Sequence, residues 1–164
     1  MSKASSSNQG KKAVKPIPEG YHALTPYLIV NDADAAIAFY RKALGASELF
    51  RMPGPDGKIG HAEIRLGDSV LMLADEHPAK HAYGPKHYGG TPINLVLYVE
   101  DVDAVVDGAL KAGATLVRPV ADQFYGDRSG IITDPFGHNW FIATHIEDVP
   151  PEELATRAAA QEKC

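Results

Sequence analysis

The chain contains two copies of one sequence segment, and this repeat constrains the fold more than any other feature. Residues 28–46 read LIVNDADAAIAFYRKALGA, and residues 97–114 read LYVEDVDAVVDGALKAGA. Identical residues occur at a constant offset before a single deletion in the second copy restores the Gly-Ala ending. A repeat of this length indicates one supersecondary unit used twice, with the functional site expected in the concavity that the two copies enclose.

Each copy lies within a longer pattern that predicts the order β-α-β-β-β. Hydrophobic spacing and turn residues assign the first unit the ranges 24–30, 33–44, 47–52, 58–66 and 69–75, the second of these being the helix. Asn31 or Asp32 is expected to cap the helix, and Gly45 suits the left-handed position that ends it. The Gly67-Asp68 pair predicts a tight turn between the last two strands.

The second unit repeats this order with its own cap and stop signals. Its predicted elements are a strand at 93–99, a helix at 102–112 and strands at 115–118, 128–133 and 138–144. Glu100 or Asp101 is the expected helix cap, and Gly113 is the expected stop. The fold class predicted from both units is α+β, with two tandem modules.

The remaining segments divide the chain into five parts. Composition predicts a disordered tail at 1–17, modules at 18–76 and 93–148, a connector at 77–92 and a C-terminal helix at 149–164. The tail is rich in Ser, Lys and Gly, whereas the connector is rich in His, Tyr, Gly and Pro and is a possible lid. The last helix has a thin apolar stripe, so it is expected to dock on the surface or on a second chain.

Composition and charge exclude several classes of function. With 164 residues, 45% of them hydrophobic, the chain can bury a core, and its net charge of −5 gives no electrostatic footprint for nucleic acid or an anionic membrane. Its apolar runs fall well short of the ~20 residues that span a bilayer, and no secretory leader is recognisable, so a cytoplasmic location is expected. The single cysteine, Cys164, rules out an internal disulfide and a cysteine metal cluster.

Several motifs, taken together with the repeat, resemble those of the vicinal oxygen chelate superfamily, which includes glyoxalase I, bleomycin-resistance proteins and extradiol dioxygenases. Within it, the chain is most similar to the PhnB-like branch. The motifs lie in about residues 18–148: AIAFYRKALGA at 36–46, GHAEIRLGDS at 60–69, LMLADE at 71–76, FYGDRSG at 124–130 and DPFGHNW at 134–140. The resemblance implies a glyoxalase-like fold of paired half-barrels around a ligand cavity.

The resemblance also implies where a metal would bind, and those positions lack its ligands. Metal-dependent members supply His or another polar ligand from the first strand of each module and Glu from the last. Here the first-strand positions fall on Thr25 and Asn94, and the last-strand positions on Leu71 or Met72 and on Phe141. Neither the usual metal nor another cofactor is therefore expected.

His61 and Glu63 are the leading catalytic candidates. They are two residues apart on a predicted strand, so both side chains leave the same face, and Arg65 continues the row. A carboxylate beside the imidazole would orient it as a general base or a ligand anchor. Two other interpretations remain open: a solvated sheet face, or a pair of displaced metal ligands completed by a residue such as His138.

The candidate ligand-binding residues come from both modules. By alternation, Thr25 with Tyr27 and Asn94 with Tyr98 are expected to point inward from the first strands. Tyr125 and Arg128 could orient an anionic or hydroxylated ligand, although an Asp127–Arg128 network that pins the loop is an alternative. Trp140 is either a ligand platform or a core residue packed between the modules.

Three functions remain in competition. The first is a small-molecule binding protein or metal-independent enzyme whose ligand lies in a cavity between the modules. The second is a divalent-metal-dependent lyase, isomerase or dioxygenase with displaced ligands such as His61 and Glu63. The third is a noncatalytic scaffold. A small-molecule ligand and a homodimer are expected, and the connector is long enough for the cavity to form within one chain or by module exchange.

Overall fold

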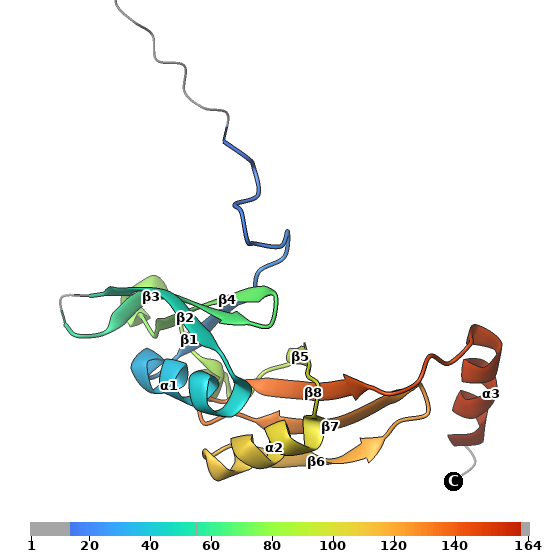
Figure 1. Cartoon of the computed structure of the whole chain (residues 1–164). Helices are drawn as coiled ribbons and strands as arrows, with labels where there is room; N and C mark the ends of the chain where they lie inside the picture. The colour runs from blue at the N-terminus through green and yellow to red at the C-terminus, as the bar shows by residue number, and fades with distance from the viewer. Residues whose placement is uncertain (1–13, 55, 162–164) are drawn as a thin grey trace, which may run out of the picture.

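The computed structural model describes residues 14–54 and 56–161 (Figure 1). Most of the expected tail, residues 1–13, and Cys164 lie outside the described residues, so the expectations for them are not addressed. No helix in the described ranges is long and apolar enough to cross a membrane.

The first module has the predicted element order. Its elements are β1 (Tyr27–Val30), α1 (Ala33–Leu44), β2 (Ser47–Pro53), β3 (Ile59–Leu66) and β4 (Ser69–Asp75). The strands form one sheet in the order β1-β4-β3-β2, in which β1 runs parallel to β4 and the other neighbours are antiparallel. Asp32 caps α1 by accepting a hydrogen bond from the Ala35 amide at 2.9 Å, and Gly45 ends the helix at φ 71°.

The second module repeats the arrangement. Its elements are β5 (Asn94–Tyr98), α2 (Val102–Lys111), β6 (Thr115–Asp122), β7 (Asp127–Thr133) and β8 (Asn139–His145). The sheet order β5-β8-β7-β6 matches that of the first module. Asp101 caps α2 as Asp32 caps α1, whereas Ala112 rather than Gly113 is the residue at the helix end. The α+β prediction with two β-α-β-β-β modules is confirmed.

The segments outside the modules contain short helices. Between the modules lie two 3₁₀ turns, η1 (Pro78–Lys80) and η2 (Pro85–Tyr88). The C-terminal helix α3 (Pro151–Gln161) lies beyond the end of β8, away from α1 and α2 (Figure 1). Arg157 on α3 pairs with Glu147, just after β8, so an ion pair joins the helix to the sheet.

The two modules meet through the faces of their sheets that carry the helices. α1 contacts α2, and aromatic side chains from both modules surround Tyr40, with Phe39 and Phe136 edge-on to its ring and Trp140 tilted against it. The hydroxyl of Tyr40 and the indole nitrogen of Trp140 both donate to the buried carboxylate of Asp134. One continuous core therefore spans both modules and lies on the helix side of each sheet.

The opposite face of each sheet is left largely uncovered by the chain. We call these the open faces. On the first sheet, one row across the open face consists of Tyr27, Met72, Glu63 and Phe50. On the second, the equivalent row consists of Val96, Phe141, Ile131 and Arg118. Tyr27, Phe50 and Val96 are 47%, 49% and 59% exposed, which leaves apolar surface in contact with solvent.

Candidate functional site

His61 and Glu63 lie side by side on the open face of the first sheet, as the alternation of β3 predicts. His61 Nε2 is 3.1 Å from Glu63 Oε1, and His61 Nδ1 is 3.2 Å from the hydroxyl of Tyr27 on β1. Both contacts are satisfied by the tautomer in which Nε2–H donates to the carboxylate and Nδ1 accepts from the tyrosine. In that tautomer the carboxylate fixes the ring and leaves Nδ1 as the basic atom.

The hydroxyl of Tyr21, in the segment before β1, donates to the other oxygen of Glu63. This bond, followed by that from His61, lowers the pKa of the Glu63 carboxyl from its usual value, so Glu63 carries its charge at neutral pH. Burial raises the pKa of Tyr27, which keeps its hydroxyl a proton donor. We call Tyr21, Tyr27, His61 and Glu63 the first polar cluster. Tyr21 was not predicted, because a residue before the first strand carries no periodic signal.

A hollow of about 420 Å³ adjoins the first polar cluster. It is lined by the N-terminal segment and the sheet, including Tyr21, Thr25, Glu63 and Met72. Thr25 lines the same hollow as Glu63, but it precedes β1 and its hydroxyl donates to the His22 carbonyl. A small molecule in this hollow would contact both a carboxylate and apolar surface.

The second sheet carries an analogous second polar cluster on its open face, made by Tyr98, Asp127, His145 and Asp148. Tyr98 donates to the buried carboxylate of Asp127 at 2.8 Å, and His145 Nδ1 lies 2.8 Å from its other oxygen. His145 Nε2 lies 3.0 Å from Asp148. The bond to Asp127, and then the bond to Asp148, raise the pKa of His145. His145 was missed because it ends the last strand without a recognisable motif.

Asn94 and Tyr98 both point from β5 to the open face, as alternation predicts, and both are exposed. Tyr125 lies in the turn before β7, with its ring edge-on to Phe124 at 5.3 Å. Tyr125 is close enough to Tyr98 to contribute to the rise in its pKa, whose chief cause is the hydrogen bond to Asp127. These three residues thus border the second sheet's open face, not the first polar cluster.

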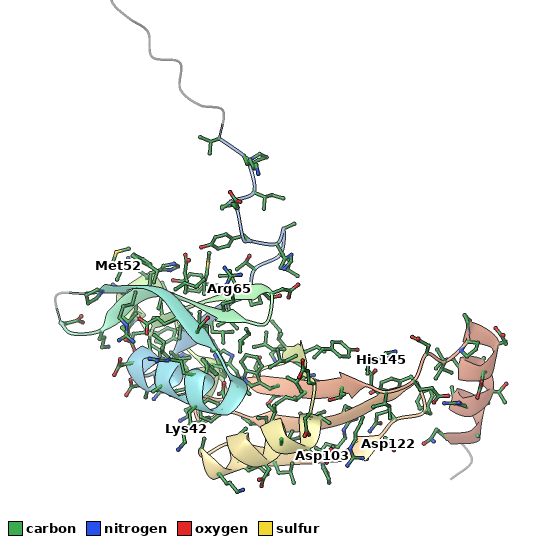
Figure 2. The ribbon with its side chains drawn as sticks, in the orientation of Figure 1. Lys42, Met52, Arg65, Asp103, Asp122 and His145 are labelled. Carbon is green, nitrogen blue, oxygen red and sulfur yellow. The ribbon has the colours of Figure 1, made fainter. Side chains whose placement is uncertain are left out.

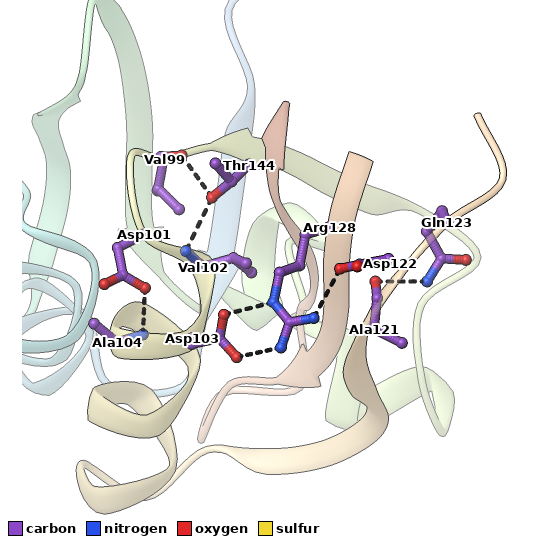
Figure 3. A network of polar contacts seen from close by, with 10 residues as sticks. All are labelled: Val99, Asp101, Val102, Asp103, Ala104, Ala121, Asp122, Gln123, Arg128 and Thr144. Atoms are coloured by element: carbon purple, nitrogen blue, oxygen red, sulfur yellow. Dashed lines mark hydrogen bonds and ion pairs between the residues drawn. The ribbon is translucent and has the colours of Figure 1, made fainter. Parts of the chain in front are cut away.

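Arg128 is directed to the other side of the second sheet (Figure 3). Its guanidinium makes two parallel hydrogen bonds to Asp103 of α2, both at 2.7 Å, and one to Asp122 of β6 at 2.8 Å. Asp127 and Arg128 are adjacent in a strand, so their side chains leave opposite faces and the predicted Asp127–Arg128 network does not form. Arg128 therefore joins helix to strand and is no neighbour of the open face.

Trp140 lies in the core, the second of its two interpretations. It is 2% exposed, and its indole nitrogen donates to Asp134 at 2.9 Å. It also lines a hollow of about 350 Å³ where the two modules meet, together with Leu24, Leu71 and Tyr98. The wall of this hollow is mostly apolar. Within one chain, it lies where the sequence predicts a cavity between the modules.

The residues at the family's metal positions do not fit a divalent ion. The last-strand side chains on the open faces include Met72 and Phe141, which offer no nitrogen or oxygen ligand. His138, the suggested third ligand for His61 and Glu63, instead bonds the Ile29 carbonyl through Nε2 at 3.1 Å. Within the described ranges, no group of three His, Cys, Asp or Glu side chains is placed to hold a metal ion.

Comparisons with known proteins agree with this architecture. The sequence model of the Glyoxalase/Bleomycin resistance protein/Dioxygenase superfamily matches residues 21–142. The uncharacterized protein Mb0911c of Mycobacterium bovis is 44% identical over 142 residues, covering 85% of this chain and 93% of the relative.

Two solved structures show the same fold. TioX from Micromonospora sp. ML1 has a TM-score of 0.61 at 27% identity, covering 75% of this chain and 98% of TioX. The PhnB protein from Bacillus cereus has a TM-score of 0.58 at 18% identity, covering 75% and 99%. At that identity the second likeness concerns the fold alone.

Proposed function

The chain belongs to the glyoxalase/bleomycin resistance protein/dioxygenase superfamily, and we propose that it binds a small molecule on the open face of its first sheet without a resident metal. The observation that carries this proposal is the first polar cluster. His61 is held between Tyr27 and Glu63, and Glu63 in turn lines a hollow on a face that the chain leaves largely uncovered. Such a combination of an apolar surface and a few fixed polar groups is typical of ligand sites.

The same cluster can also support proton transfer. A ligand that displaces the Tyr27 hydroxyl would meet His61 Nδ1 directly, while Glu63 would stabilise the imidazolium formed when that nitrogen accepts a proton. The proposed activity is therefore binding, with metal-independent proton abstraction as the chemistry that the side chains allow. The metal-dependent alternative has less support because His138 is bonded elsewhere and no described His, Cys, Asp or Glu joins His61 and Glu63 as a third ligand.

We further propose that two copies of the chain cover each other's open faces. Among the described residues, no hydrogen bond or ring contact joins the two open faces within one chain, because the modules meet through their helix sides. The faces expose Tyr27, Phe50, Val96 and Tyr98. A homodimer would bury this apolar surface and enclose the hollow.

Native mass spectrometry of freshly purified protein tests these proposals, with metal analysis on the same sample before and after chelation. We expect a dimer without a stoichiometric metal and with either an empty site or a retained small molecule. A small-molecule screen by thermal shift then supplies a ligand. We expect its affinity to fall at least about tenfold in Glu63→Gln, equivalent to the loss of about 1.4 kcal/mol.

The matched control is His77→Gln, an exposed histidine between β4 and η1 that lines a different hollow from the one beside Glu63. A ligand whose affinity is unchanged in both His61→Gln and Glu63→Gln would overturn the proposed site. A stoichiometric divalent ion removed only by the chelator would instead support the metal-dependent alternative, with ligands contributed by both copies.

A further inference from the structure

Arg118 differs from the three arginines whose guanidinium groups form ion pairs. Arg51, Arg128 and Arg157 each bridge two carboxylates. Arg118 has no carboxylate within ion-pair distance in the part of the chain that the structure describes, and its Nε is buried without a hydrogen-bond partner there. A partly desolvated guanidinium without a counter-ion is costly, so its retention needs an explanation.

The position of Arg118 places it on the open face of the second sheet. β6 pairs Arg118 with Ile131 of β7, which in turn pairs with Phe141 of β8, and the register of β6 is irregular on both sides of Arg118. The guanidinium carbon lies 5.0 Å from the centre of the Phe141 ring, and Nη2 donates to the buried hydroxyl of Ser129 at 2.9 Å. The ring and the hydroxyl hold the guanidinium flat against the sheet.

One end of the guanidinium remains available. Nη1 makes no hydrogen bond to a described residue and, unlike Nε, is not fully buried. On the same face of the sheet, the carboxylate of Asp127 is already bonded to Tyr98 and His145. The positive charge of Arg118 is therefore not neutralised by its surroundings.

We propose that Arg118 is a carboxylate-binding residue, which anchors the acidic group of a small molecule whose aromatic or apolar body lies over Phe141 and Val96. A single planar guanidinium matches the planar carboxylate, whereas a phosphate would be expected to draw on several cations. The apolar row Val96–Phe141–Ile131 beside the guanidinium supplies the surface for the body. This inference goes beyond the proposed function, because it assigns a second ligand site on the open face of the second sheet.

Benzoate is the probe, because it combines one carboxylate with an aromatic ring, and benzamide is its neutral analogue. Binding is followed by backbone amide shifts in NMR spectra of the full chain. We expect benzoate to shift the amides of Arg118, Ser129 and Phe141, and benzamide to leave them unmoved. In Arg118→Met the benzoate affinity should fall at least about tenfold.

Arg41→Met is the matched control, because it removes the same charge from the exposed surface of α1 and should bind benzoate like the unaltered protein. Shifts that lie elsewhere, or that are equal in Arg118→Met, would overturn the proposal. The proposal would also be overturned if the unaltered protein did not bind benzoate and Arg118→Met were monomeric. Arg118 would then pair with a carboxylate of the second copy.

The melting temperature separates binding from a structural role. Because Arg118 lacks a counter-ion, Arg118→Met should melt at the same temperature as the unaltered protein or higher, and a large fall would overturn the proposal. Arg118→Lys keeps the charge but not the planar fork, and should bind benzoate more weakly while remaining folded. If benzoate binds through Arg118 while the His61 and Glu63 variants bind the screened ligand normally, this inference stands and the proposed first-sheet site is wrong. If those variants lose the screened ligand while benzoate does not bind through Arg118, the first-sheet site stands and this inference is wrong.

Discussion

Tyr40, on the helix of the first module, donates its hydroxyl hydrogen to Asp134 of the second module at 2.7 Å, with both side chains buried. Burial raises the pKa of Tyr40 well above its usual value, so the hydroxyl stays protonated. Asp134 also accepts hydrogen bonds from Trp140 Nε1 and from the amides of Phe136 and His138. This carboxylate thus replaces its lost hydration with four donors at the junction of the modules.

We predict that Tyr40→Phe lowers the free energy of unfolding by about 1–3 kcal/mol, because it leaves one lone pair of a buried carboxylate without a donor. Chemical denaturation followed by tryptophan fluorescence measures the change, since Trp140 is the single tryptophan and bonds the same carboxylate. Tyr88→Phe on the exposed connector is the control and should be neutral. Equal stability of Tyr40→Phe and the unaltered protein would contradict the assigned role.

The first polar cluster gives Glu63 a pH-dependent contribution to stability. The pKa of its carboxyl is lowered in the folded state by the Tyr21 hydroxyl first and by His61 second. A lowered folded pKa adds stability that is present above the ordinary glutamate pKa of about 4.3 and is lost as pH falls through the folded value.

Glu63→Gln should therefore reduce the loss of stability on acidification below about pH 4.3. Tyr21→Phe removes the largest cause of the shift, so we expect the same change to a smaller degree. Denaturation curves collected over a pH series measure both variants. If both variants lost stability at acid pH in the same way as the unaltered protein does, the hydrogen bonds of the first polar cluster would not form in solution.

Arg128 provides a contrast with Arg118, since both lie on neighbouring strands of one sheet but on opposite sides. The pKa of Asp103 is lowered chiefly by its hydrogen bonds from Arg128, as expected of a surface ion pair. Figure 2 shows Asp103 and Asp122 on the helix side of the second sheet, whereas His145 lies on the other side.

We predict that Arg128→Met lowers the melting temperature by a few degrees at low salt, and by less at high salt because the pairs are exposed and screened. Its benzoate affinity should equal that of the unaltered protein, since the guanidinium does not reach the open face. Thermal melts at two ionic strengths and the benzoate titration test both statements. A loss of benzoate binding in Arg128→Met would instead support the prediction that Arg128 binds the ligand.

The local fold could be predicted from the sequence because its signals are local. Asp32 and Asp101 were among the expected caps, and Gly45 ends α1. Strand ends were less accurate: β6 extends to Asp122, beyond the predicted 118, because irregular pairing with β7 continues past Pro119. No local pattern marks such a bulged extension.

The site was predictable only within a strand. Alternation places His61 with Glu63, but it cannot show that the Tyr21 hydroxyl would bond Glu63. Nor can it show that Asp127 would bond His145 and Tyr98 instead of its neighbour Arg128. Arg118 was not singled out, because a lone arginine in a strand becomes informative only when its missing partners are seen. These relationships depend on tertiary packing between elements, which periodicity does not encode.

The second polar cluster yields a prediction of opposite sign to that of Glu63. Asp127 first and Asp148 second raise the pKa of His145 in the folded protein. A raised folded pKa gives stability that is fully present below the unfolded value of about 6.5 and is lost as pH rises through the folded value. The stability difference between the unaltered protein and His145→Gln should therefore narrow as the solution is made alkaline.

An NMR titration of the His145 ring protons measures the shift directly. We expect a midpoint above about 6.5 in the unaltered protein. Asp148→Asn should lower the midpoint, and Asp127→Asn should lower it further because Asp127 is the larger cause. A titration midpoint at or below about 6.5 would mean that His145 does not bond both Asp127 and Asp148 in solution. The carboxylate of Asp127 would then be free to bind a ligand.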